Sequence, residues 1–420
     1  MFTRIEFAAE HDEEFFAQLP ASPAVFVLRA KAPGGEPYIS KTANLRRRLL
    51  RLLGAVEGRR LSLRERVAAV EYCEVGGDFE AGFTLYRLLR AAFPEKYSER
   101  LHLRPAPLIH LLKDNAYPRV AVTSRIRSLR GAGAYFGPFA TRAEAEQYAN
   151  DSLDFFFLRR CTEELAPDPK FPGCVYSEMK MCLAPCFKGC SDDRYAEESG
   201  RVERYLETGG HSLLVEISRA RDEASERLEF EAAAAAHAKL EKLKAVRGRA
   251  AEIVHRIDRL NGILLQPSHL PGHIALFRIA GGMLHGPIQF DVSGRVPKKD
   301  AAVGADVEAA QAQNAPVQRV PVQSNPLQSM EARIKELLRE ADVARPRSAQ
   351  EWMEHLALLK RWYYRTSKVG EIFFEDDHDQ LPMRRVVRAV GRVFKGEKPV
   401  GDLSETAGDY WTFRAREAGL

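Results

Sequence analysis

The N-terminal part of the chain combines short β-prone runs with amphipathic stretches. The run PAVFVLR at 23–29, the turn KAPGGE and the run PYIS predict a β-hairpin. In TANLRRRLLRLLG we expect a helix that Thr42 caps and Gly54 ends, because leucines recur at helical spacing between arginines. A strand at 70–75 and a helix from about Phe79 to Ala92 complete a small α/β unit.

The rest of the chain changes its periodicity several times. Residues 259–292 alternate between apolar and polar positions with glycine turns, which predicts a small antiparallel sheet. Residues 293–326 show little periodicity and are typical of a flexible linker. Helices are expected at 192–208, 210–255, 328–342 and 348–366. The predicted fold class is a multidomain α+β protein.

Length and hydropathy set the class of protein. A chain of 420 residues with 45% hydrophobic residues suggests two to four domains with ordinary cores. No run of about eighteen apolar residues is present, so we expect no membrane span. The start of the chain is acidic and mixed, unlike a signal peptide, which indicates a cytoplasmic protein.

Positive charge is unevenly distributed, although the net charge is only +5. Basic residues concentrate at 41–66 and again at 384–398. Basic faces of this density are typical of proteins that bind nucleic-acid phosphates, although a solvated helix face is the alternative. The candidate DNA-binding residues in the first region are Arg46, Arg47, Arg48 and Arg51.

A second basic stretch, EHLALLKRWYYR, interleaves cations with aromatic side chains. Such a pattern can stack on bases, and a half-buried helix is the alternative. The residues concerned are Lys360, Arg361, Trp362, Tyr363, Tyr364 and Arg365.

Five of the six cysteines lie within one stretch rich in proline, glycine and charge: Cys161, Cys174, Cys182, Cys186 and Cys190. The sixth, Cys73, lies in an apolar run and is expected in a core. Without an export signal we expect thiols that bind a metal, with reduced, unligated cysteines as the alternative. The spacing suits zinc and an iron–sulfur cluster equally well.

The cysteine stretch, ending in MCLAPC, resembles that of the bacterial excinuclease component UvrC. This resemblance implies a [4Fe–4S] cluster held by Cys161, Cys174, Cys182 and Cys186, with zinc as the alternative. Cys190 is then not a ligand. The segments KDNAYPRVAVT and GAYFGPFATRAEAEQYAND are also similar to this family.

The segments PAVF and PYISKTANLRRRL resemble a GIY-YIG nuclease domain. The resemblance implies Tyr38, Lys41 and Arg48 as remnants of a catalytic site. Other positions depart from the family pattern. Phe26 replaces the first motif tyrosine, Ser40 replaces a glycine, and Leu85 replaces the metal-binding glutamate. The asparagine of the family is also missing.

These departures affect the expected chemistry. Hydrolysis of a phosphodiester in this family needs a divalent cation, and a leucine cannot ligate one. Glu80 lies on another side of the predicted helix from Leu85. We therefore expect an inactive or crippled nuclease, in which Mg²⁺ or Mn²⁺ has a role only if activity survives.

The piece LEFEAAAAAHAKLEKLKAV resembles a UVR motif through Phe230, Glu231, Ala233 and Ala234. The resemblance implies pairing with UvrB, the helicase of the excinuclease system. An ordinary alanine-rich hairpin that packs on its own domain is the alternative.

The resemblance as a whole implies a UvrC-like, DNA-binding protein of nucleotide excision repair, closest to the short Cho-type members. The alternatives are an active Cho-type endonuclease with an unrecognised carboxylate, and an iron–sulfur scaffold or sensor outside repair. The predicted divisions are a GIY-YIG-like domain at 1–125, a cysteine-cluster domain at 126–208, a UVR-like hairpin at 209–255 and a C-terminal α+β region at 256–420.

Overall fold

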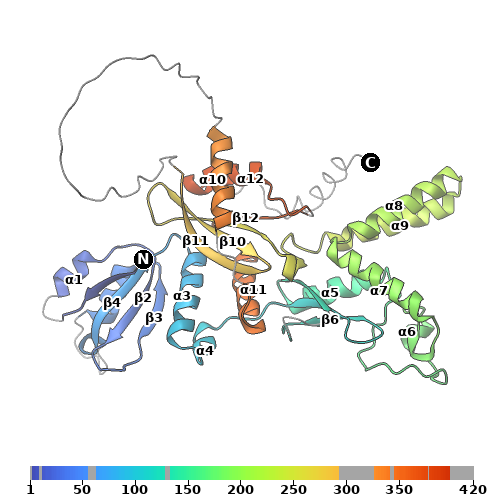
Figure 1. Cartoon of the computed structure of the whole chain (residues 1–420), viewed down its shortest axis with the longest axis horizontal. Helices are drawn as coiled ribbons and strands as arrows, with labels where there is room; N and C mark the ends of the chain where they lie inside the picture. Colours follow the sequence, from blue (N-terminus) through green and yellow to red (C-terminus); the bar gives the residue numbers. More distant parts are fainter. Residues whose placement is uncertain are drawn as a thin grey trace, which may run out of the picture.

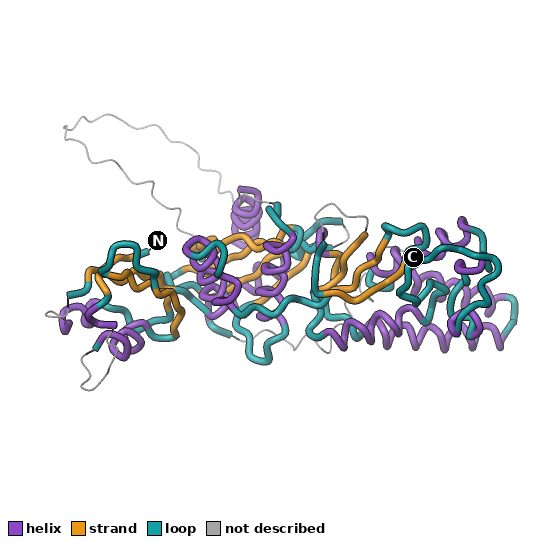
Figure 2. Tube along the Cα trace, turned by 90° about the horizontal axis from the view of Figure 1, so that it is seen from below, coloured by secondary structure: helices purple, strands orange, loops and turns teal. Residues whose placement is uncertain are grey.

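The computed structural model describes residues 2–8, 12–54, 63–127, 133–292, 326–340, 345–376 and 378–397. These residues form three four-stranded antiparallel sheets, spread along the longest axis of the molecule in Figure 1. Figure 2 shows the same elongated arrangement from below. The mixed α+β class that the sequence predicts is confirmed.

The first sheet has the strand order β1-β4-β2-β3. Its elements are β1 (Thr3–Glu6), α1 (Asp12–Gln18), β2 (Ala24–Ala30), β3 (Tyr38–Thr42), α2 (Leu45–Leu53) and β4 (Val67–Glu74). The predicted hairpin is β2 with β3, and its register places Phe26 opposite Ser40. The leucine stripe of α2 is buried against Phe26 and other residues of the sheet, as its periodicity predicts.

The cap of α2 differs from the prediction. Asn44 caps the helix, because its side-chain oxygen accepts the backbone N–H of Arg47 at 2.9 Å. Thr42 still belongs to β3, and its hydroxyl accepts the backbone N–H of Asn44 at 3.2 Å. Thr42 therefore supports the turn that brings Asn44 into the capping position.

The middle sheet has the order β6-β5-β7-β8, and α5 packs against it. The elements of this part are β5 (Leu108–Leu112), β6 (Arg119–Thr123), β7 (Gly133–Gly137), α5 (Arg142–Leu153), α6 (Val175–Glu178), a 3₁₀ turn (Pro185–Phe187), α7 (Asp192–Glu207) and β8 (His255–Arg256). The sheet draws strands from both sides of residue 125, where the sequence suggested a domain boundary.

Two long helices, α8 (His211–Glu226) and α9 (Phe230–Arg247), pack against each other as an antiparallel hairpin. The hairpin projects away from the sheets, at the upper right of Figure 1. These helices are the helical hairpin expected within 210–255.

The third sheet has the order β11-β10-β9-β12, so the small antiparallel sheet expected at 259–292 is present and gains a fourth strand. Its elements are a 3₁₀ turn (Ile257–Arg259), β9 (Gly262–Pro267), β10 (His273–Ala280), β11 (Met283–Asp291), α10 (Pro326–Glu340), α11 (Ala349–Tyr363), β12 (Glu371–Phe374) and α12 (Met383–Lys395). Helices α10 and α12 cover one face. Residues 293–325 of the expected linker lie outside the described residues.

Helix α3 (Asp78–Ala92) joins the first sheet to the third. It follows β4 in the chain, yet Phe79, Phe83 and Tyr86 enter the core that α11 forms on the other face of the third sheet. On its opposite side, Ala81 packs against Val25 of β2. The first sheet is therefore attached to the C-terminal part of the chain through a shared hydrophobic core.

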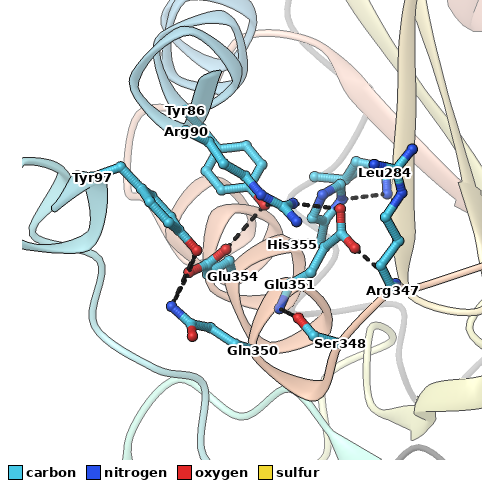
Figure 3. A network of polar contacts seen from close by, with 10 residues as sticks. All are labelled: Tyr86, Arg90, Tyr97, Leu284, Arg347, Ser348, Gln350, Glu351, Glu354 and His355. Atoms are coloured by element: carbon cyan, nitrogen blue, oxygen red, sulfur yellow. Dashed lines mark hydrogen bonds and ion pairs between the residues drawn. The ribbon is translucent and has the colours of Figure 1, made fainter. Parts of the chain in front are cut away.

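A buried polar network reinforces this attachment, as Figure 3 shows. The carboxylate of Glu354 on α11 accepts the hydroxyl of Tyr86 at 3.0 Å and that of Tyr97, on α4 (Tyr97–Leu101), at 2.8 Å. The amide of Gln350 donates to the same carboxylate at 3.0 Å. Arg90 on α3 pairs with Glu351. These donors satisfy a carboxylate that is only 9% exposed.

No helix in the described part of the chain is both long and apolar enough to cross a membrane.

Candidate functional sites

Two of the predicted catalytic remnants meet on the α2 side of the first sheet. A guanidinium nitrogen of Arg48 donates to the hydroxyl of Tyr38 at 3.3 Å. The Nε atom of Arg48 is buried without a hydrogen-bond partner among the described residues. Phe26 is fully buried, and its ring centroid lies 6.1 Å from that of Tyr38. The site thus keeps one hydroxyl and one guanidinium, with an apolar ring at the position of the first motif tyrosine.

Two further motif positions, Lys41 and Leu85, line a separate cavity on the α3 side of the sheet. Leu85 packs with Val25 and Ala81 and with the core beneath the third sheet. Lys41 forms an ion pair with Asp78 at 2.5 Å. Four of the motif positions therefore lie together as two pairs, Tyr38 with Arg48 and Lys41 with Leu85.

Asp78 is the carboxylate that sequence reasoning missed. It lies seven residues before Leu85 on α3, which is nearly two full turns and so the same helix face. Both Lys41 and Arg365 pair with it. Burial alone would raise the pKa of Asp78, but the hydrogen bonds and charges of these two cations outweigh burial and hold the pKa below its ordinary value. The helical spacing could have identified Asp78, whereas Arg365 comes from a distant part of the chain.

Glu80 is not available to a metal ion. It is 2% exposed, and its carboxylate accepts the backbone N–H of Gly76 at 2.8 Å. Burial raises its pKa, which that hydrogen bond only partly offsets. This placement agrees with the helical geometry expected from the sequence, which directs Glu80 away from Leu85.

The arginines of α2 differ in their contacts. Arg46 is exposed, yet it is tied to the loop between α1 and β2, because its Nε donates to the carbonyl of Leu19 at 2.7 Å. Arg48 is engaged by Tyr38. Arg47 and Arg51 are exposed on the helix surface. These two are the better candidates for phosphate contact within the predicted basic face.

Two thiols of the cysteine stretch, Cys182 and Cys186, lie within electrostatic reach of Cys161 and Cys174. Burial raises the pKa of the Cys182 thiol, and the neighbouring Cys174, Cys186 and Cys161 raise it as well. Burial likewise raises the pKa of the Cys186 thiol, and the neighbouring Cys174 and Cys161 raise it further. Cys190 differs, because its charged neighbours are Asp192 and Arg194 and it packs on the core of the middle sheet.

The donor chemistry of these four thiols fits a thiolate-held centre. As placed, however, no three His, Cys, Asp or Glu side chains among the described residues could together hold a metal ion. The stretch is anchored beside the thiols by Arg159, which is 2% exposed. Its guanidinium donates to the carbonyls of Tyr117 and Glu163, each at 2.9 Å, and to the sulfur of Cys161 at 3.4 Å.

The end of the α8–α9 hairpin is apolar and exposed. Phe230 is 69% exposed and Leu228 is 70% exposed, at the turn between the helices. Glu231 and Ala234 are exposed and Ala233 is half-buried. In α9 the buried side chains are confined to the second half of the helix: Leu240, Leu243 and Val246. The motif-like residues thus face solvent at the end of the hairpin distant from the sheets.

One segment of the chain matches a known protein family. Residues 106–206, which run from the middle sheet through the cysteine stretch into α7, match the family described as UvrC/Cho excinuclease, middle domain. No solved structure matches the chain.

Curated relatives extend the similarity beyond this domain. The chain is 28% identical over 250 residues to UvrABC system protein C of Rickettsia bellii, which covers 58% of this chain and 38% of that protein. It is 30% identical over 237 residues to UvrABC system protein C of Rhizobium meliloti, with 54% of this chain and 33% of that protein covered. The protein of Idiomarina loihiensis is 26% identical over 288 residues, 63% of this chain and 45% of its own length. The chain is thus similar to these UvrABC system C proteins over somewhat more than half of its own length, and it spans between a third and a little under half of theirs.

Proposed function

We propose that the chain is a DNA-binding protein of nucleotide excision repair whose GIY-YIG-like domain no longer cleaves DNA. The family supports the repair role, because the named relatives are components of the UvrABC system. One observation carries the proposed loss of activity. The metal-ligand position of the motif is Leu85, and the nearest carboxylate on that helix face, Asp78, is engaged by two cations.

The chemical reason is the charge that builds up during phosphodiester hydrolysis. A bound divalent cation polarises the phosphate and activates water, and a guanidinium stabilises the developing charge. Arg48 can supply the second function. A carboxylate held by Lys41 and Arg365 is a poor ligand for Mg²⁺, since its negative charge is already neutralised. The domain then serves to hold DNA through its basic surface.

The second candidate function is an active, Cho-type endonuclease that uses Asp78 as its carboxylate. The observation that favours it is the position of Asp78, beside the motif lysine and on the helix face of Leu85. For this function, DNA or metal binding would have to displace at least one of the two cations from Asp78.

A nicking assay on damaged duplex with Mg²⁺ or Mn²⁺, alone and with a UvrB-type helicase, separates the two candidates. We expect no metal-dependent nicking by the natural protein. If nicking occurs, and both Arg48→Ala and Asp78→Asn abolish it, the second candidate is correct. Asp193→Asn, on the exposed start of α7, is the matched control for loss of one carboxylate.

The cysteine stretch is proposed to hold a [4Fe–4S] cluster through Cys161, Cys174, Cys182 and Cys186, with zinc as the alternative. The donor set supports this assignment, since all four thiols are half-buried and Cys182 and Cys186 lie within electrostatic reach of Cys161 and Cys174, whereas the charged neighbours of Cys190 are Asp192 and Arg194. The cluster, when bound, would cross-link four points of a stretch that has little regular structure of its own. Arg159 would hold Cys161 in place from the side of the middle sheet.

The partner proposed for the α8–α9 hairpin is a UvrB-type helicase. An exposed Phe230 and Leu228 at the end of a projecting hairpin support it, because apolar side chains exposed together are typical of interaction surfaces. The alternative is that the hairpin only packs on its own domain. This accounts for the second half of α9, where the buried side chains lie, but not for the exposed end.

A further inference from the structure

The cavity on the α3 side of the first sheet lies between two distant parts of the chain. It has a volume of about 50 Å³ and is walled by residues of β3 and α3 on one side and of α11 on the other. Its apolar wall includes Leu85 and Trp362, whereas Lys41, Arg361 and Arg365 carry positive charge to it.

Positive charge around this cavity exceeds the negative charge that balances it. Asp78 is shared between Lys41 and Arg365. Arg361 has no hydrogen bond or ion pair to any described residue, and neither has Arg104, which follows the cavity residue Leu103.

The lowered pKa of Lys360, beside Arg361, agrees with this excess of positive charge. Burial lowers the pKa of Lys360, and the nearby charge of Arg104 lowers it further, against a partial compensation by Glu144. Three cations (Lys41, Arg361 and Arg365) line the cavity against one lining carboxylate, that of Asp78. Arg104 and Lys360 add two more positive charges, each next in sequence to a lining residue. A bound anion would relieve the repulsion between like charges.

The aromatic side chains of α11 are already occupied, which restricts the kind of ligand. Trp362 is buried, and its indole donates to the carbonyl of Val369 at 3.2 Å. Tyr363 is buried, and the hydroxyl of Tyr364 donates to the carbonyl of Pro138 at 2.9 Å. Burial thus prevents Trp362 and Tyr363 from stacking on bases, although the sequence pattern suggested that they could, whereas Arg361 and Arg365 on either side of them are exposed.

We propose that Arg361 near the end of α11 and Arg365 just beyond it form, with Lys41, a site for a backbone phosphate of DNA. Arginine suits this ligand, because its planar guanidinium donates two parallel hydrogen bonds to phosphate oxygens. The site rests on the proposed DNA-binding function and extends it. DNA held by α2 on the first sheet would be held a second time by the C-terminal region, at the junction that α3 and the Glu354 network keep in place.

The test compares two variants with the same loss of charge. Arg361→Gln with Arg365→Gln removes the proposed contacts. Arg142→Gln with Arg339→Gln, on α5 and α10, removes two exposed arginines elsewhere. Binding of a fluorescent DNA duplex is measured between low and physiological salt. We expect the first variant to bind at least tenfold more weakly at low salt, with a salt slope lower by about 1 to 2, and the control to bind like the natural protein.

The outcomes separate this inference from the proposed function. If the natural protein does not bind DNA, both fail. If it binds DNA and the two variants behave alike, the phosphate site is wrong and the proposed function stands. A parallel measurement adds inorganic phosphate or a nucleoside monophosphate and follows the melting temperature. The phosphate could stabilise the natural protein but not the Arg361→Gln, Arg365→Gln variant, while both bind DNA equally well. That result would assign the site to a small phosphate ligand and overturn the inference.

Discussion

Single residues decide which chemistry each predicted site can support. In the proposed nuclease pattern, Leu85 and Phe26 stand where a metal ligand and a hydroxyl are expected, while Arg48 donates a hydrogen bond to Tyr38. Cys190 differs from Cys182 and Cys186, because its charged neighbours are Asp192 and Arg194 and not other thiols.

Substitution of one cysteine tests the proposed cluster. Cys182→Ser should reduce iron and sulfide to near zero in anaerobically purified protein and bleach its visible absorbance, because three ligands underligate a [4Fe–4S] centre. Cys190→Ser is the matched control and should retain both. Stoichiometric zinc without iron in the natural protein would keep the site and rule out the cluster.

His355 should make stability fall on mild acidification. Burial lowers its pKa from 6.5 to about 4, and its Nδ1 accepts the backbone N–H of Leu284 at 2.9 Å in the neutral form. Glu351 opposes this shift, whereas His285 and Arg90 support it. A depressed pKa means that the stabilisation is complete above pH 6.5 and is lost as the pH falls towards 4.

The size of this effect follows from the shift, and amounts to on the order of 3 kcal/mol. Urea unfolding between pH 7.5 and 4 should show a flatter pH dependence for His355→Gln than for the natural protein. Other carboxylates contribute to both curves, so their difference isolates His355. Parallel curves would show that His355 does not titrate as described.

Elements determine which predicted surfaces are available. Helix α2 buries three of its leucines and exposes Arg47 and Arg51 on its surface, whereas Arg46 and Arg48 make hydrogen bonds to the carbonyl of Leu19 and the hydroxyl of Tyr38. The α8–α9 hairpin buries the second half of α9 and exposes the end that carries Phe230.

Charge reversal on α2 tests the DNA-binding face. Arg47→Glu with Arg51→Glu should weaken binding of unrelated DNA sequences alike and flatten the salt dependence, because phosphate contacts carry no sequence information. The same reversal at Arg142 and Arg339 serves as the control. An unchanged salt slope in the α2 variant would mean that this face is merely solvated.

The exposed end of the α8–α9 hairpin is expected to bind the partner, and its side chains should contribute little to the stability of the fold. Phe230→Ser with Leu228→Ser should leave the melting temperature nearly unchanged, since both side chains are about 70% exposed. Binding to a UvrB-type helicase should weaken by at least tenfold in calorimetry or pull-down titration. Leu270→Ser, a partly exposed leucine beside the third sheet, should not weaken it. Equal binding by both variants would exclude the end of the hairpin as the interface.

Across the whole molecule, α3 makes the first and third sheets interdependent. Its aromatic side chains lie in the core beneath the third sheet, and the buried carboxylate of Glu354 accepts hydroxyls from α3 and α4. The cavity proposed to hold a DNA phosphate exists only because these parts are joined.

Loss of the Glu354 carboxylate should loosen this junction. Glu354→Ala leaves the hydroxyls of Tyr86 and Tyr97 without their acceptor, at a cost of about 3 kcal/mol in the free energy of unfolding. Hydrogen exchange should accelerate in α3, α4 and α11 before it does so in the middle sheet. Glu226→Ala, an exposed glutamate on α8, is the control. Uniform acceleration throughout the chain would contradict a local role for the network.

Local elements and the chemistry of the motifs follow from the amino-acid sequence alone. Periodicity predicts the β2–β3 hairpin, the leucine stripe of α2, the helical hairpin and the antiparallel sheet at 259–292, because each depends on neighbours close in the chain. The assignment of the α2 cap to Thr42 is wrong, since Thr42 and Asn44 are both good capping residues and only the end of β3 distinguishes them.

Contacts between residues far apart in the chain arise only from tertiary packing. The sequence could not show that α3 leaves its own sheet to enter the core of another, because an apolar helix face does not specify its partner. The same limit applies to Arg365 beside Asp78, nearly three hundred positions apart, and to Glu354 beneath Tyr86 and Tyr97. Such pairs form when packing brings distant elements together, and the amino-acid pattern of either element alone is compatible with many other neighbours.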